Sequence, residues 1–414
     1  MGIIGAWVTV LILHQLSIGG TWDPVTPITW VWAILWVAAL SLGYTLTTDS
    51  SKSTIEAEEP RVIDTTVNRL IKVYCTIVIV GVILFVFDFA VLRGYGFTNS
   101  AAAIRSEEVN AAVTGGTSSS FFSGIARLII PSVLPLVIIV IRFWGLISRQ
   151  AVLLFALTMI FLALQQLLFE GGRFLIASII VSGIFTYFSS NPSRRHVNLR
   201  KRKIPIFRLF FIGIVMLSFF SYVFVDRALE RGDFFALAYL QSITSYNINA
   251  SYDQLYLFEG PFGGLWYSLC MLWLYATQGI NELDLILRQP YLEHAYGLYQ
   301  FPHLAQAILL STGVDLRYNA LVNLPTYGSY ATFYGHSFVD FGNYGSLAQA
   351  LVLGYLTGRG ILDLSKGRTG SLAVAAPILF TICLFSPIIS LVPTIWPGFF
   401  WALLAGRILR GKGN

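Results

Sequence analysis

Residues 191–208 read NPSRRHVNLRKRKIPIFR, and this strongly basic link between two apolar stretches decides the arrangement of the chain. Apolar residues make up 56% of the sequence, and many stretches approach the roughly 20 apolar residues that a helix needs to cross a bilayer. Because Lys and Arg resist translocation, we expect the link at 190–208 on the cytoplasmic side. The sequence therefore predicts an all-α integral membrane protein with one polytopic domain over residues 1–414.

Counting outward from the basic link places both termini in the cytoplasm and a long loop, residues 226–338, outside. Two apolar stretches in that loop, 262–279 and 301–313, either lie in the membrane interface, re-enter it or cross it. Crossing by both would raise the number of spans from ten to twelve. The ten predicted spans are 3–19, 28–48, 71–92, 124–142, 150–168, 172–189, 206–225, 340–358, 371–389 and 391–407.

The basic residues divide unevenly between the two sides. In this topology, 19 of the 27 fall inside, including every lysine, and the eight outside are all arginine. A guanidinium binds phosphate through two parallel hydrogen bonds, which an ammonium does not do, so an arginine-only face suits a phosphate-bearing ligand. Interfacial anchoring is an equally good interpretation for Arg93, Arg127 and Arg227, which lie beside span ends. The eight are Arg93, Arg105, Arg127, Arg173, Arg227, Arg231, Arg288 and Arg317.

Several function classes are disfavoured. The net charge of +6 arises from cytoplasmic loops, so it does not indicate nucleic-acid binding. The three cysteines lie in apolar segments without metal spacing, and we expect neither a metal nor a cofactor. The chain contains no phosphate-binding P-loop, which disfavours an ATP-driven mechanism. It also contains no series of acids or histidines within the spans, which disfavours a proton-coupled pump.

The first candidate site is Glu170-Gly171-Gly172-Arg173, at the outer start of a predicted span. Two glycines allow a tight turn and a close approach of the backbone to a ligand. The following helix presents free N–H groups and a partial positive charge, and Arg173 adds a full charge. These features predict a phosphate site at membrane level. A plain glycine turn with an anchoring arginine is the alternative.

The second candidate is the segment from Asn323 to Gly342, which contains Asn323-Leu324-Pro325-Thr326-Tyr327-Gly328 and Tyr334-Gly335-His336, then Asp340-Phe341-Gly342 before a span. His336 is a candidate general base near neutral pH. Asp340 would orient that histidine or contact sugar hydroxyls, and Tyr334 has a ring that suits sugars. Alternatively, His336 is a hydrogen-bonded structural residue and Asp340 a helix cap.

The third candidate is a set of residues in the 226–338 loop, of which Arg288 and Arg317 would reach a phosphate; the set is Arg288, Glu293, His294, His303, Asp315 and Arg317. Arg105 lies in a separate Gly/Ser-rich loop at 93–123. For each of them, a solvated loop residue is an equally good interpretation.

These features together resemble a known family, the Wzy-type O-antigen and oligosaccharide repeat-unit polymerases, which are related to the O-antigen ligases. The resemblance covers the architecture of the whole chain. It is specific at Gly172-Arg173 and from Pro325 to Gly345, including Tyr334 and Asp340-Phe341-Gly342.

The resemblance implies a GT-C-like membrane glycosyltransferase in the bacterial inner membrane. Its donor and acceptor would both be glycans on undecaprenyl pyrophosphate, and a chain-length regulator protein is an expected partner besides membrane lipid. Arg173 would stabilise the leaving pyrophosphate with help from Arg105, Arg288 or Arg317, and His336 would activate the acceptor hydroxyl. Glu170, Gly172 and Tyr334 would contribute to substrate binding.

Two other functions are open. One is a ligase that transfers the glycan to a lipid core. The other is a transporter, such as a flippase for the same carrier lipid. A flippase should have charges lining a cavity within its spans and should lack a long outside loop, and the sequence shows the opposite pattern.

Overall fold

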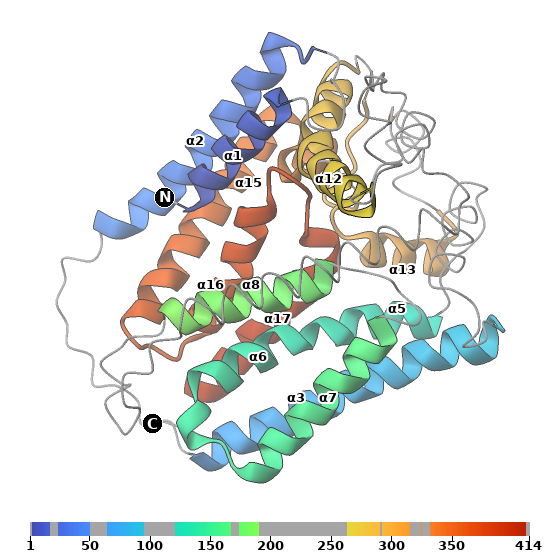
Figure 1. Cartoon of the computed structure of the whole chain (residues 1–414), viewed down its shortest axis with the longest axis vertical. Coiled ribbons are helices and arrows are strands. Elements are labelled where there is room, and N and C mark those ends of the chain that lie inside the picture. The colour runs from blue at the N-terminus through green and yellow to red at the C-terminus, as the bar shows by residue number, and fades with distance from the viewer. Residues whose placement is uncertain are drawn as a thin grey trace.

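A computed structural model of the chain describes residues 2–16, 24–49, 64–94, 121–166, 174–189, 263–289, 292–314, 324 and 332–410, and within them it is helical without a β-strand (Figure 1). The α-helices are α1 Gly2–Gln15, α2 Pro27–Asp49, α3 Asp64–Phe87, α5 Phe121–Ile129, α6 Val133–Arg142, α7 Arg149–Gln165, α8 Phe174–Ser189, α12 Gly263–Leu287, α13 Pro302–Thr312, α15 Phe333–Ser365, α16 Ser371–Phe385 and α17 Val392–Arg410.

Helices occupy nine of the ten ranges that the sequence predicts as spans, and the tenth, 206–225, lies outside the described residues. Four helical stretches are long and apolar enough to cross a membrane, namely Pro27–Thr47, Asp64–Leu92, Phe121–Arg142 and Val392–Arg410. Four further apolar helices, α1, α7, α8 and α16, are shorter. Aliphatic side chains such as Ile34 and Leu153 are exposed on the outer faces of α2 and α7, as in a helical membrane protein.

The described part of the predicted outside loop also contains helices. α12 extends past the apolar stretch at 262–279 to Leu287, and it packs against α1, α2 and α15. α13 covers most of the other apolar stretch, at 301–313. Neither helix is among the four stretches long and apolar enough to span. A large part of the segment from 263 to 314 is therefore integrated into the helical bundle.

α15 is the central helix, and it packs most extensively against α2 and α16 (Figure 1). A Cβ atom added at Gly354 would collide with the carbonyl oxygen of Leu40, and one at Gly358 would lie 3.0 Å from the carbonyl oxygen of Tyr44. Small residues allow such close approach of membrane helices. Because Leu40 meets Gly354 and Tyr44 meets Gly358, the two helices run in the same direction, as the predicted alternation of spans requires.

α15 is broken near its start. Gly342 has φ 67° and ψ −172°, which lie outside the helical region and favour glycine. A Cβ atom at this position would also lie only 2.9 Å from Nε2 of His294. The break separates a short polar N-terminal part, which begins at Phe333, from the long part that packs against α2.

We expect Gly354→Ala to destabilise the protein, because the added methyl group has to push the backbones of α2 and α15 apart. Overpacking of this kind costs about 1–3 kcal/mol. Thermal unfolding of the purified protein in detergent measures the effect. Gly5→Ala in α1 is the matched control, because a Cβ atom there meets nothing within 4 Å. An equal melting temperature for Gly354→Ala and wild type would contradict the close packing.

The orientation can be tested by labelling single cysteines in a chain that lacks Cys75, Cys270 and Cys383, all of which are buried. Tyr296 is 82% exposed in the predicted outside segment, and Ser365 is exposed at the predicted cytoplasmic end of α15. We expect Tyr296→Cys to react with a membrane-impermeant maleimide in intact cells, and Ser365→Cys to react only after lysis. The reverse pattern would show that the orientation is wrong.

Candidate functional site

Asp340 joins the start of α15 to the turn at 295–301. Its Oδ1 accepts hydrogen bonds from the backbone N–H groups of Gly297 and Tyr299, both at 2.9 Å, and its Oδ2 accepts one from Gln300 at 3.0 Å. A buried carboxylate is strongly held when several backbone amides donate to it. The side chain thus has a structural function, and no hydrogen bond links it to His336, the histidine that it was expected to orient.

The helix break supports the same contact. A break in a helix leaves carbonyl groups of the preceding turn without their intrahelical partners. The carbonyl oxygens of Val339 and Asp340 accept hydrogen bonds from Ala295 at 3.1 Å and Tyr296 at 3.0 Å. The turn is therefore bound to α15 through both the backbone and the Asp340 carboxylate, and we call this assembly the Asp340 clamp.

His336 lies one turn before Asp340 on α15 and is only 5% exposed. Its ring packs against Tyr299, with centroids 4.7 Å apart and planes at 63°. Neither ring nitrogen has a hydrogen-bond partner. His336 belongs to the predicted outside segment, and its burial lowers the pKa to about 3, so the ring is neutral at pH 7. A neutral imidazole has one nitrogen that can accept a hydrogen bond, but a pKa this far below neutrality makes the ring a weak base in this state.

Tyr334 is fully buried, and its hydroxyl donates to Oδ1 of Asn343 at 2.7 Å. Because Asn343 follows the break at Gly342, this bond connects the two parts of α15. The ring packs beside Trp36 of α2, with centroids 6.4 Å apart. The expected sugar-binding tyrosine thus lies in the helical core in this structure.

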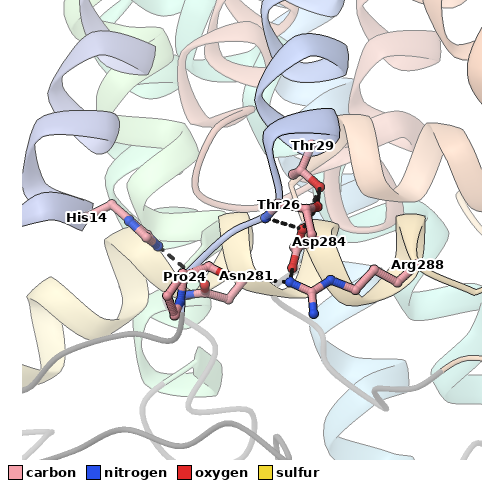
Figure 2. A network of polar contacts seen from close by, with 7 residues as sticks. All are labelled: His14, Pro24, Thr26, Thr29, Asn281, Asp284 and Arg288. Atoms are coloured by element: carbon pink, nitrogen blue, oxygen red, sulfur yellow. Dashed lines mark hydrogen bonds and ion pairs between the residues drawn. The ribbon is translucent and has the colours of Figure 1, made fainter.

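Arg288 lies at the C-terminal end of α12 and forms an ion pair with Asp284, as Figure 2 shows. Asp284 also accepts hydrogen bonds from the hydroxyls of Thr26 and Thr29, which lie before and within α2. Burial raises the pKa of Asp284, but these hydrogen bonds and the Arg288 charge outweigh it and hold the pKa below its ordinary value. The Arg288 side chain remains 46% exposed.

A polar face of α12 was not predicted from the sequence. Gln278, Asn281 and Glu282 are all buried, at spacings of three and four residues that place them on one side of a helix. Asn281 Oδ1 lies 3.4 Å from Nε2 of His14 in α1 (Figure 2). Both carboxyl oxygens of Glu282 and both amide atoms of Gln278 lack hydrogen-bond partners. The sequence signal that could have predicted this face is the spacing of three polar residues at the end of an apolar stretch.

Five of the predicted site residues lie outside the described part of the chain. Around the Gly-Gly turn, however, both flanking helices have the predicted positions, because α7 ends at Gln165 and α8 begins at Phe174, directly after Arg173. The five residues are Arg105, Glu170, Gly172, Arg173 and Arg317.

Arg93 is more than an interfacial anchor. Its guanidinium forms an ion pair with the fully buried Asp88 at 2.9 Å and lies 4.5 Å from the centroid of the Phe89 ring. Removing it would leave a buried carboxylate without this partner, which is costly. Arg93 is therefore unsuitable as a silent control for arginine substitutions.

Among the described residues, no three His, Cys, Asp or Glu side chains are grouped so that they could hold a metal ion. Comparison with family models, curated proteins and solved structures finds no match for the chain.

We expect Asp340→Asn to lower the melting temperature, because one carboxyl oxygen becomes an NH2 group that faces a backbone donor. Loss of a buried hydrogen bond to a charged group costs about 1.5–3 kcal/mol. Asp363→Asn is the control, because this acid lies near the other end of α15 and its partner Arg368 is 40% exposed. Unchanged stability for Asp340→Asn together with lost activity would instead assign the carboxylate to substrate.

Proposed function

We propose that the chain is a membrane glycosyltransferase that polymerises oligosaccharide repeat units carried on undecaprenyl pyrophosphate. The observation that carries the proposal is the Asp340 clamp together with His336. Both Asp340 and His336 lie in the motif region from Pro325 to Gly345. His336 is buried and neutral, and neither of its ring nitrogens has a hydrogen-bond partner. It lies against the turn at 295–301, which five hydrogen bonds hold to α15. An unpaired buried polar group is costly, and such groups concentrate at functional sites.

The reaction needs two things from the protein. A hydroxyl of the acceptor sugar attacks the anomeric carbon of the donor glycan, so a carbon–oxygen bond forms there as the bond to the pyrophosphate breaks. The hydroxyl proton passes to a base, for which His336 is the candidate. Bound substrate would have to raise the lowered pKa of its ring toward neutrality for it to serve. The lipid pyrophosphate leaves with its bonding electrons, and cationic side chains stabilise the developing negative charge.

Arginine is suited to the second task. Of the arginines assigned to phosphate, Arg288 is described, and its half-exposed side chain is held in position by the ion pair with Asp284. Such positioning lowers the cost of ordering the side chain when a ligand binds. Arg173, directly before α8, remains our candidate for the leaving pyrophosphate, with Arg105, Arg288 or Arg317 assisting and with Glu170 and Gly172 contributing to binding. Tyr334 is not among these residues, because it is buried against Trp36 and bonded to Asn343.

The proposal includes the location of the reaction. The enzyme would span the bacterial inner membrane about ten times with a GT-C-like arrangement, with both termini in the cytoplasm and the site facing outward. Its ligands would be lipid-linked glycans and membrane lipid, and a chain-length regulator would be a protein partner. A related ligase would use the same donor chemistry, and a deletion strain distinguishes the two. A polymerase mutant retains single repeat units at the surface, whereas a ligase mutant accumulates polymer on the carrier lipid.

We expect the purified chain in proteoliposomes to form polymer from lipid-linked repeat units without ATP or an ion gradient. Arg173→Ala should lower the rate roughly 10- to 150-fold, which corresponds to one charge-assisted contact of about 1.5–3 kcal/mol. Arg173→Lys should also be impaired, because it keeps the charge and loses the planar fork.

Arg149→Ala is the control for these variants, because Arg149 is exposed at the start of α7 on the predicted cytoplasmic side. Full activity of Arg173→Ala would remove this residue from the site. Transport of intact repeat units without polymer, or product that depends on an imposed gradient, would favour a transporter.

A further inference from the structure

The polar face of α12 contains five hydrogen-bonding atoms without partners. They are the two carboxyl oxygens of Glu282, the amide oxygen and nitrogen of Gln278, and Nδ2 of Asn281. Glu282 is fully buried, and Gln278 and Asn281 are 1% and 4% exposed. Asn281 and Glu282 lie three and four residues after Gln278, so each is a neighbour of Gln278 on the helix surface.

Two other buried polar side chains of α12, Thr277 and Asp284, are hydrogen-bonded within the structure. Thr277 donates to the carbonyl oxygen of Trp273 at 2.8 Å, and Asp284 accepts from Thr26 and Thr29. Each unsatisfied buried group costs about 1–3 kcal/mol. The concentration of such groups at Gln278, Asn281 and Glu282 therefore indicates a ligand that completes the hydrogen bonds.

The unpartnered atoms define the chemistry of that ligand. Burial raises the pKa of the Glu282 carboxyl to about 8, so the group is neutral at pH 7 and both donates and accepts hydrogen bonds. The amide oxygen of Gln278 and the carbonyl oxygen of Glu282 only accept, and an ionised pyrophosphate has no donor for them, so the face is unsuited to the pyrophosphate of the carrier lipid. Two of the five atoms are amide nitrogens, which donate hydrogen bonds and do not coordinate cations. Hydroxyl groups both donate and accept, so a set of neighbouring hydroxyls matches this mixture of donors and acceptors.

The position of the face agrees with the proposed site. Ile286 lies one turn after Glu282 on the same side of α12. It packs in one apolar cluster with Ala295 and Val339, which belong to the Asp340 clamp. The polar face is therefore continuous along α12 with the surface that contacts the clamp.

We propose that Gln278, Asn281 and Glu282 form a binding site for sugar hydroxyl groups, and that the sugar is the acceptor end of a lipid-linked repeat unit. The identity of the sugar as acceptor rests on the proposed function, whereas binding of a hydroxyl-rich ligand does not. The residues are assigned to substrate binding, so their loss should affect KM more than kcat.

The test uses the full chain in nanodiscs and lipid-linked repeat units extracted from the producing cells. Initial rates of polymer formation are measured against repeat-unit concentration. We expect Glu282→Gln and Gln278→Leu each to raise KM about 2- to 12-fold, as for the loss of a hydrogen bond between neutral groups. Thr277→Val should leave KM unchanged, because its hydroxyl bonds within α12.

A second measurement separates binding from a structural function. Gln278→Leu replaces an unsatisfied buried amide with an apolar group of similar size, so its melting temperature should equal or exceed that of wild type. A lower melting temperature with unchanged KM would overturn the binding site. Glu282→Gln and Gln278→Leu are judged independently, so misfolding of one variant leaves the other as the test.

A third measurement separates this inference from the proposed function. Retention of radiolabelled repeat units by the immobilised chain is measured without turnover. If wild type forms no polymer but binds repeat units more tightly than Glu282→Gln, the polymerase proposal fails and the binding site stands. If wild type forms polymer and both variants retain and polymerise repeat units as wild type does, the binding site fails and the polymerase stands. Absence of both binding and polymer in wild type would overturn both.

Discussion

The contact between α2 and α15 is the constraint on which the rest of the structure depends. The two backbones approach at Gly354 and Gly358 so closely that no larger side chain fits, and this fixes the long part of α15 against α2. The short part, beyond the break at Gly342, is held to the same helix by Trp36, whose ring lies 5.6 Å from that of Phe333. With both parts of α15 positioned by one partner, Asp340 and His336 are presented to the turn at 295–301 in a defined arrangement.

Hydropathy and charge predicted much of the fold. Nine of the ten predicted spans coincide with described helices, because a helix in a bilayer has to satisfy its own backbone and therefore leaves a long apolar signal. The start of α8 after Arg173 was likewise predicted, from two glycines and a charged residue. Hydropathy does not fix the number of membrane crossings in the same way. Four apolar helices are shorter than the stretches long enough to span, namely α1, α7, α8 and α16.

Long-range polar contacts could not be predicted in the same way. The Asp340 carboxylate accepts hydrogen bonds from backbone amides that lie 40 to 43 residues earlier in the sequence. Nothing in the local sequence distinguishes such an acceptor from a helix cap. Arg93 was interpreted as an anchor because it lies beside the end of a predicted span. The sequence did not show that its guanidinium pairs with Asp88 inside that span. The polar face of α12 was hidden by its apolar neighbours, since an average over a long window dilutes three polar residues.

The parallel packing of α2 and α15 also has a consequence for biosynthesis. The two helices are separated by roughly 300 residues, so a ribosome that adds about 5–20 residues per second exposes α2 for about 15–60 s before α15 emerges. During that time the tightly fitting surface of α2 has only lipid or the insertion machinery as a neighbour. The central contact of the bundle is therefore among the last to form, and a nascent chain that stops before α15 lacks the partner that its second helix is shaped to meet.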